Sequence, residues 1–171
     1  MTPLNNAPID DYEALIAILN KHQVDFVIVG AYAVGLHGYI RATTDIDILV
    51  KPKPENAVRV SAALKEFNGV EVDPAKIKGN TIIELGVKPN GLHIMTHITG
   101  VAWEKAWSSR VQSDFGNQPA AFLSKECLIE TKRTCGRNKD NLDLIGLGVE
   151  LDKTRNSKIT KKKMRGQGFE L

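Results

Sequence analysis

Apolar and polar residues along the chain follow two kinds of spacing. Apolar residues recur at helical intervals between Leu15 and Leu19, which predicts an amphipathic helix over 10–22. Short, mostly apolar stretches at 25–30 and 45–50 are typical of buried strands. The same reasoning predicts helices over 31–38, 55–67, 102–110, 125–136 and 138–149, a hairpin of strands over 81–87 and 92–98, and a brief strand over 119–123.

Local signals mark where several of these elements begin and end. Pro52 and Pro54 stop the preceding strand, because proline lacks the N–H that a sheet needs. Ser124 is a typical N-cap and Gly136 a typical C-terminal residue for the helix between them. The turn-like sequence KPNG separates the two strands of the hairpin, so the sheet should not be wholly parallel. The predicted fold class is α/β (α+β), a small mixed sheet with flanking helices and a helical C-terminal end.

The composition is that of a folded domain rather than of a disordered or membrane-spanning chain. Of 171 residues, 42% are hydrophobic and 25% are charged, which leaves enough apolar material for a real core. No apolar run approaches the length of a membrane span. The N-terminal sequence lacks a basic segment followed by an apolar one. We therefore expect one domain over 1–150, a cytoplasmic location and no membrane contact.

Positive charge is concentrated at the C-terminal end. From Lys153 onward the chain has seven basic residues and one acid, Glu170. The net charge of this segment is therefore more positive than the net charge of +3 of the whole chain, and the remainder of the chain is negative. The segment 151–171 is also poor in apolar residues, which is typical of a disordered tail. It is either a solvated tail or a loose contact for phosphate or nucleic acid.

Two residue pairs have plain structural interpretations. Cys127 and Cys135 are eight apart in a predicted helix, which separates them by about 12 Å, too far for a disulfide. We interpret them as reduced structural thiols. Trp103 and Trp107 are four apart on a predicted helix and form one apolar stripe. We expect both in the core, with base stacking as the alternative.

An acidic pair interrupts the strand predicted over 45–50. Residues two apart on a strand point to the same face, so Asp45 and Asp47 project together while Ile46 and Ile48 face the core. Neighbouring carboxylates repel each other, and desolvation increases the cost. Mg²⁺ or Mn²⁺ would remove this conflict, and Mg²⁺ commonly binds through carboxylates together with substrate phosphates. The alternative is an exposed edge strand with two solvated aspartates.

A glycine precedes the acidic pair at the point where a strand is followed by a short helix. Gly30 lets the backbone approach a ligand closely, and a helix N-terminus directs free N–H groups at an anion. Taken alone, this sequence also suits a tight turn. A glycine turn one short helix before an acidic strand is stronger evidence for a nucleotide site, because the two features can face one cleft.

The stretch VGAYAVGLHGYIRATTDIDILV resembles the polymerase-beta-like nucleotidyltransferase superfamily. It is most similar to the small bacterial branch of stand-alone nucleotidyltransferases and toxin–antitoxin or abortive-infection components. The family pattern is a strand, a glycine turn, a short helix and a strand with two acids, with a third acid on a neighbouring strand. The resemblance continues through GLHIMTHITGVAWEKAW and LSKECLIETKRTCGRNKDNLDL and covers most of residues 10–148. It implies a nucleotidyltransferase fold.

The resemblance assigns roles to four residues. Gly30 and Ala31 take the place of the glycine turn that holds triphosphate, although the family usually has serine or glycine where Ala31 stands. Asp45 and Asp47 match the acids that hold two divalent ions, Mg²⁺ or Mn²⁺, beside the acceptor hydroxyl and the triphosphate. The implied function is transfer of a nucleoside monophosphate from NTP to a hydroxyl of a small molecule, an RNA or a protein.

The third family acid is missing from this sequence. Its place falls on His93 when the sequences are aligned on Gly100. His93 is therefore a candidate catalytic residue, either as a nitrogen ligand that suits Mn²⁺ or Zn²⁺, or as the mark of an absent base and weak turnover. Glu84, on the preceding strand, offers a substitute carboxylate. His97 is expected on the same strand face as His93.

Basic residues near the acids offer contacts for the triphosphate. Arg41 matches the arginine of the family stretch R-x-T-x-D-x-D, and it either binds phosphate or pairs with the first of the two aspartates. Lys132 and Lys139, at the end of one predicted helix and the start of the next, are candidate phosphate ligands. In the alternative, Lys139, Asp140 and Asp143 form surface pairs that join the two helices.

The sequence leaves three functions open. The first is the metal-dependent nucleotidyltransferase. The second is a catalytically weak or inactive nucleotide-binding module that acts as a partner protein of the toxin–antitoxin type. The third is a nucleic-acid-binding protein that depends on the basic tail, whose affinity would fall steeply with salt.

Overall fold

The computed structural model describes residues 9–86 and 89–151. The strands are β1 (Phe26–Val29), β2 (Asp45–Val50), β3 (Ile82–Leu85), β4 (Gly91–Met95), β5 (Val111–Phe115) and β6 (Gln118–Phe122). The helices are α1 (Ile9–Lys21), α2 (Gly30–Leu36), α3 (Pro54–Asn68), α4 (Trp103–Ser108), α5 (Lys125–Cys135) and α6 (Asn138–Gly146), with a 3₁₀ turn η2 (Pro74–Lys76).

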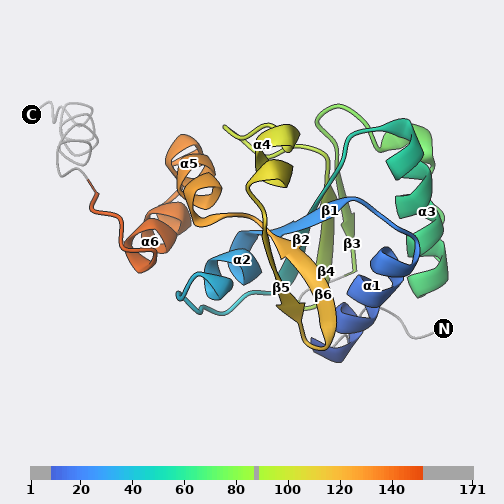
Figure 1. The fold of residues 1–171 in the computed structure, drawn as a ribbon, viewed down its shortest axis with the longest axis horizontal. Coiled ribbons are helices and arrows are strands. Elements are labelled where there is room, and N and C mark those ends of the chain that lie inside the picture. Colours follow the sequence, from blue (N-terminus) through green and yellow to red (C-terminus); the bar gives the residue numbers. More distant parts are fainter. Residues whose placement is uncertain (1–8, 87–88, 152–171) are drawn as a thin grey trace, which may run out of the picture.

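The strands form one mixed sheet in the order β3-β4-β2-β1-β6-β5. Strand β2 is antiparallel to β1 and parallel to β4, and β1 is parallel to β6. The edge strands β3 and β5 are antiparallel to their neighbours. Helices α1 and α3 lie side by side at one side of the sheet, whereas α2, α5 and α6 gather at the other side (Figure 1). The predicted α/β class, mixed sheet and helical C-terminal end are confirmed.

A continuous apolar core lies between the sheet and helices α1 and α3. All four residues of β1 are buried, as expected for a central strand. Leu15, Ile16 and Leu19 of α1 and Leu64 of α3 are fully buried in the same core cluster. Helix α3 begins with Pro54 in its first turn and ends at Gly69, which has φ +73°. The core packs against Ile46 and Ile48 on one face of β2, and the two acids project from the other face.

Strand β5 was not predicted from the sequence pattern. Gln112, Ser113 and Asp114 give its centre no apolar signal, and most of the strand is exposed. It forms because it pairs along its whole length with β6 in a tight hairpin, where Gly116 adopts φ +61°. Strand β4 also ends at Met95, earlier than predicted, because the chain beyond it enters a separate bridge between Ile98 and Val101.

The predicted tail lies outside the described residues except for Leu151. The boundary of the 1–150 domain therefore stays a prediction. Within 9–86 and 89–151, no helix combines the length and the apolarity that crossing a bilayer requires.

Candidate active site

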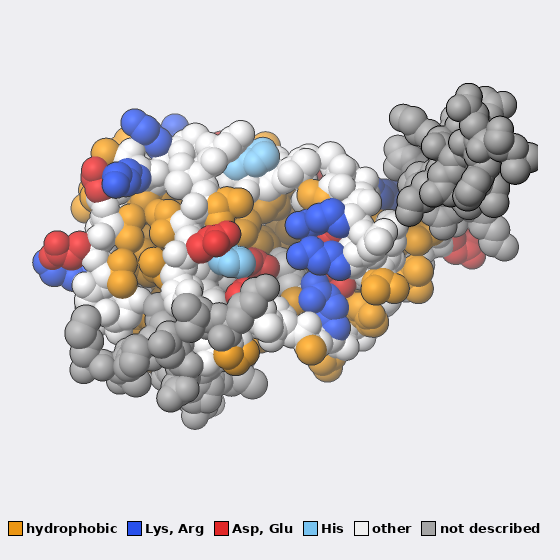
Figure 2. All heavy atoms as spheres, turned by 180° about the vertical axis from the view of Figure 1, so that it is seen from behind, with side chains coloured by type: hydrophobic (Ala, Val, Ile, Leu, Met, Phe, Trp, Pro, Cys, Tyr) orange, Lys and Arg blue, Asp and Glu red, His pale blue; other side chains and the backbone are white. Residues whose placement is uncertain are grey.

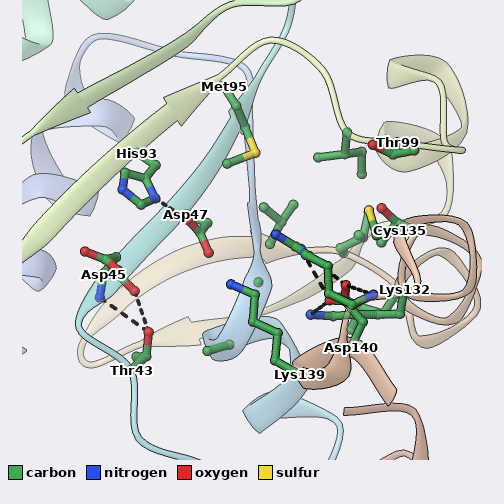
Figure 3. A pocket seen from close by; sticks show the side chains of 18 of the residues that line it. Thr43, Asp45, Asp47, His93, Met95, Thr99, Lys132, Cys135, Lys139 and Asp140 are labelled. Atoms are coloured by element: carbon green, nitrogen blue, oxygen red, sulfur yellow. Dashed lines mark hydrogen bonds and ion pairs between the residues drawn. The ribbon is translucent and has the colours of Figure 1, made fainter. Parts of the chain in front are cut away.

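The two aspartates of β2 project into a cleft of about 810 Å³. Asp45 and Asp47 are partly exposed, whereas Ile46 and Ile48 are fully buried, as strand alternation predicts. Thr44 donates a hydrogen bond from its hydroxyl to Asp45 Oδ2 at 2.8 Å. Figure 3 shows both carboxylates on the same side of the sheet. The predicted site residues all line this one cleft: Gly30, Ala31, Arg41, Asp45, Asp47, His93, Lys132 and Lys139.

Two glycines make room for the carboxylates. Gly30 has φ +64°, and a Cβ placed on it would overlap the Asp47 carboxylate. A Cβ on Gly91, which pairs with Asp45 across β2 and β4, would overlap the Asp45 carboxylate. Tyr12 of α1 donates a hydrogen bond to the Gly91 carbonyl at 2.8 Å and so holds β4 in place. Both acids therefore lie against bare backbone.

Two side chains near the acids, those of Ala31 and Tyr12, carry no charge at neutral pH. Ala31 is nearly buried and lines the cleft with a methyl group, so it contributes no hydroxyl. Burial, with smaller contributions from Tyr32, Asp45 and Asp47, raises the pKa of Tyr12 to about 12. Tyr12 therefore stays protonated and acts as a donor to the backbone, not as a base.

His93 stands between two acids on neighbouring strands. In the sheet register it lies opposite Asp47 of β2 and opposite Glu84 of β3. His93 Nδ1 is 2.8 Å from Asp47 Oδ1. Glu84 is exposed, lines the cleft and has no ion-pair partner in the part of the chain that the structure describes. His97 lies beyond the end of β4 and also lines the cleft. Whether His93 is a metal ligand or marks an absent base stays a prediction.

A buried ion-pair network forms the opposite wall of the cleft. Asp140 and Asp143 lie one turn apart on α6 and are fully buried. Lys132 Nζ of α5 is 3.2 Å from Asp140 and 2.5 Å from Asp143. Arg41 binds both Asp143 oxygens, from Nε at 2.6 Å and Nη2 at 3.1 Å. The structure thus differs from two predicted alternatives: the α6 acids face α5 and not the surface, and Arg41 pairs with Asp143 and not with Asp45.

The network keeps its acids ionised. Burial by itself raises the pKa of Asp143, but hydrogen bonds and charges from Arg41 and Lys132 outweigh it, so the pKa lies below its ordinary value. Arg137 and Lys132 lower the pKa of Asp140 against burial in the same way. The hydrogen bond to Asp143 raises the pKa of Arg41. The positive charges of Lys132 and Arg41 are therefore largely compensated inside the wall.

Two other basic side chains of this wall face the solvent-filled cleft. Lys139 is exposed and has no ion-pair partner among residues 9–86 and 89–151. The Arg137 side chain is 59% exposed and contacts Asp140 from Nε at 2.7 Å. Figure 2 shows a row of Lys and Arg side chains across the cleft from acidic and histidine side chains. Sequence reasoning missed Arg137, although it stands three residues before Asp140 in the stretch that carries the family resemblance.

The thiols are unpaired, as predicted, and Cys127 and Trp103 are buried, whereas Cys135 lies at the cleft. Cys127 is buried and Cys135 is exposed, and both are free thiols. Trp103 is buried and stacks on the partly buried Trp107, with ring centroids 5.2 Å apart. The Arg110 guanidinium lies over the Trp107 ring, 3.8 Å from the ring centroid. Trp107 is therefore already in contact with Trp103 and Arg110, which argues against base stacking on it.

A solved structure shares this architecture. The crystal structure of the lincosamide antibiotic adenylyltransferase LnuA bound to lincomycin matches with a TM-score of 0.54 and 14% identity, over 84% of this chain and 98% of that chain. The chain has a nucleotidyltransferase fold. No family model and no curated protein matches the sequence. At this identity the likeness establishes the fold alone, so the toxin–antitoxin branch stays a prediction.

The nucleotidyltransferase cleft supplies donors of the kind that a hard divalent cation takes. Asp45 and Asp47 present carboxylate oxygens on one face, and Asp47 Oδ2 lies next to Gly30 while Oδ1 faces His93. Within the described residues no cluster of three or more His, Cys, Asp or Glu side chains is arranged to hold a metal by itself. Mg²⁺ commonly binds two carboxylates of the protein and takes further oxygen ligands from substrate phosphates. The residues present therefore fit a cation that arrives with a nucleotide.

Proposed function

We propose that this protein is a metal-dependent nucleotidyltransferase that moves a nucleoside monophosphate from NTP to a hydroxyl acceptor. One observation carries the proposal: the Asp47 carboxylate lies directly against the Gly30 turn, across the cleft from the exposed Lys139 and Arg137. Carboxylate oxygens, bare backbone and positive charge are the three features that hold a triphosphate with its cation. The fold shared with an adenylyltransferase supports the same chemistry.

Each element of the cleft has a role in this proposal. Asp45 and Asp47 hold Mg²⁺ or Mn²⁺, which when bound screens the triphosphate and polarises the reacting groups. Backbone N–H groups at Gly30 and Ala31 bind phosphate oxygens. Lys139 acts as a point charge for the terminal phosphates.

Arg137 adds a second phosphate contact. Its guanidinium lines the cleft beside Lys139 and keeps donors that Asp140 does not use. Lys132 and Arg41 act indirectly in this scheme. They pair with buried aspartates and are only 8% and 28% exposed, so they position the wall that carries the more exposed Arg137 and Lys139.

The transfer is a substitution at the α-phosphorus of the nucleotide. The acceptor oxygen forms a bond to this phosphorus while the bond to the oxygen that bridges to the β-phosphate breaks. Pyrophosphate leaves, and the hydroxyl proton passes to water or to a nearby carboxylate. The protein contributes alignment and charge compensation, because phosphoryl transfer needs little covalent help.

His93 favours a second candidate function, a nucleotide-binding module with weak or no turnover that acts as a partner protein of the toxin–antitoxin type. It stands where the resemblance places the third acid, and its Nδ1 engages Asp47. Loss of a general base typically costs about 10²–10⁴ in rate. Such a module would bind NTP but transfer its nucleoside monophosphate poorly.

One experiment separates the two candidates. Calorimetry measures NTP binding with Mg²⁺ or Mn²⁺, and a radiolabelled-NTP assay measures transfer to a pool of small hydroxyl compounds, RNA and protein. If the protein is an enzyme, we expect both binding and transfer, and Asp45→Asn should reduce the transfer rate about a hundredfold or more. Mutating even a residue that only hydrogen-bonds to a metal ligand typically lowers activity about ten- to a hundredfold. Asp114→Asn, exposed on β5, is the matched control.

The variant His93→Asp restores the acid of the family pattern and so tests whether its absence limits transfer. Binding without transfer in the natural chain, together with transfer restored by about 10²–10⁴ in His93→Asp, supports the second candidate. Active natural protein with no gain in the variant supports the first. Absence of NTP binding in every variant overturns both.

A further inference from the structure

The sheet carries an apolar surface immediately beyond the acids. Met95 of β4 and Ile82 of β3 are direct neighbours in the register, and both line the cleft. Ile82 is 60% exposed although it is a large apolar side chain, and Met95 is partly exposed. We call these two residues the apolar shelf. Glu84, two residues from Ile82 on the same strand face, borders the shelf beside His93.

Positive charge lies on the other side of the acids. The Lys and Arg residues that line the cleft come from the segment before β2 and from the α5–α6 wall: Arg41, Lys132, Arg137 and Lys139. In the described part of β3 and β4 none lines it. Figure 2 shows acidic and histidine side chains between a hydrophobic area and the row of basic side chains. A phosphate backbone laid on the shelf would meet Glu84, and no Lys or Arg in the described part of β3 and β4 lines the cleft to compensate that charge.

The in-line geometry of the transfer places the acceptor at the shelf, an inference that rests on the proposed function. In-line displacement brings the acceptor oxygen to the α-phosphorus from the side opposite the leaving pyrophosphate. Pyrophosphate is drawn toward Lys139 and Arg137, and the α-phosphorus lies at Asp45 and Asp47. The acceptor must then arrive from the β3–β4 side.

We propose that the apolar shelf and Glu84 form the acceptor subsite, and that the acceptor is a small hydroxyl compound with an apolar body and a cationic group, not an RNA. The apolar body covers Ile82 and Met95, and the cation pairs with Glu84. The acceptor oxygen bonds to the α-phosphorus, pyrophosphate leaves toward the basic wall, and the hydroxyl proton passes to water in the open cleft.

Met95 provides a direct reporter for this subsite. The chain has three methionines, and Met95 alone lies within 9–86 and 89–151. Methyl-labelled methionine in the full chain gives few NMR signals, and Met95→Leu identifies the one from the shelf. The chemical shift of the Met95 methyl group reports binding at the shelf and does not depend on turnover. RNA bound elsewhere on the chain should not change it.

The probes are three compounds that share a phenyl ring and a hydroxyl: phenylalaninol, which is cationic, N-acetylphenylalaninol, which is uncharged, and phenyllactate, which is anionic. With NTP and Mg²⁺ present, phenylalaninol is expected to shift the Met95 signal at the lowest concentration and phenyllactate at the highest. The cationic probe should bind about two- to fivefold more tightly than the uncharged one, the range for an exposed ion pair. A short oligoribonucleotide with a free terminal hydroxyl should leave Met95 unchanged.

Variants on the exposed edge strand test the two parts of the subsite without disturbing the core. Glu84→Gln should abolish the preference for the cationic probe, and Glu84→Lys should reverse it. Ile82→Ala should weaken all three probes by about three- to tenfold, because apolar area is lost from the shelf. Val58→Ala, equally exposed on α3 and outside the cleft, is the matched control.

Several outcomes would overturn the inference. A Met95 shift caused by NTP alone, with the phenyl probes excluded, would assign the shelf to the nucleotide base. A Met95 shift caused by the oligoribonucleotide, or equal affinity for the anionic and cationic probes, would remove the proposed selectivity. Calorimetry of NTP on the same sample reports the proposed function separately: no NTP binding ends that proposal, whereas NTP binding with a silent Met95 ends only this one.

Discussion

Lys132 and Lys139 line the same cleft from consecutive helices, but their charges lie in different surroundings. The Lys132 side chain is 8% exposed and contacts two fully buried aspartates. Lys139 is exposed and keeps its charge for a ligand. Identical side chains can thus serve the framework or the substrate, depending on whether a buried acid already compensates them.

Lys139→Met is expected to weaken NTP binding by about ten- to a hundredfold, because a hydrogen bond to a charged group contributes about 1.5–3 kcal/mol. Thermal stability should hardly change, since Lys139 is a surface residue. Lys132→Met should instead lower the free energy of unfolding by about 3–5 kcal/mol, because it leaves two buried carboxylates short of a partner. Calorimetry and thermal unfolding of both variants check this division, which fails if Lys139→Met binds NTP as the natural chain does.

At the scale of elements, the buried network joins three segments that are distant in sequence. Arg41, before β2, meets Asp143 of α6, and Asp143 and Asp140 meet Lys132 of α5. The α5–α6 pair is thereby tied to the segment that leads into the acidic strand. Any loosening of this connection should move the basic wall relative to Asp45 and Asp47.

The network predicts a specific acid sensitivity. The pKa values of Asp140 and Asp143 are lowered in the folded protein, so the unfolded chain takes up protons first as the pH falls. The stabilisation is therefore complete above the ordinary aspartate pKa of about 4 and is lost as the pH falls through the lower folded values. Asp143→Asn should be less stable than the natural chain at neutral pH by about 3–5 kcal/mol, and the difference should shrink below about pH 4.

Thermal unfolding of both proteins across this pH range, followed by circular dichroism, gives the measurement. Asp114→Asn is the control, because Asp114 is exposed on β5 and has no ion pair among the described residues. A difference between Asp143→Asn and the natural chain that stays constant down to acid pH would contradict the assignment.

At the scale of the whole molecule, the cleft lies where the sheet meets the α5–α6 pair. Its walls come from opposite ends of the described chain: Gly30 and Asp47 from the first third, and Lys139 from the last helix. One wall is acidic and apolar, and the other is basic (Figure 2). The basic tail, which lies outside the described residues, is a separate concentration of positive charge in the sequence.

Truncation after Asp152 tests whether the tail acts independently of the cleft. We expect NTP affinity to stay unchanged, because every described residue that lines the cleft is retained. Any affinity of the full chain for single-stranded RNA should fall steeply with salt and should vanish on truncation, since tail phosphate contacts release counterions. Fluorescence anisotropy with labelled RNA over a salt series measures this, and RNA binding retained by the truncated chain would place the contact elsewhere.

Local patterns predicted most of the elements and the acidic pair. Strand alternation was sufficient to place Asp45 and Asp47 on one face, because side-chain direction along a strand depends only on position. Strand β5 escaped this reasoning, since its centre is polar and its pairing partner supplies its order. Arg137 and the paired state of Lys132 escaped it because burial and ion pairing are properties of contacts between elements.

The sequence by itself determined most of the helices and strands and their order, the two acids on one strand face, and the glycine at the turn beside them. These follow from local steric and periodic rules that act within a few residues. Only the tertiary structure decided that Gly30 and Gly91 lie beneath the carboxylates, that Asp143 holds Arg41 and Lys132, and that the apolar shelf borders the acids. Those facts depend on which segments meet in space, and it is the packing of the whole chain that determines which surfaces are brought together.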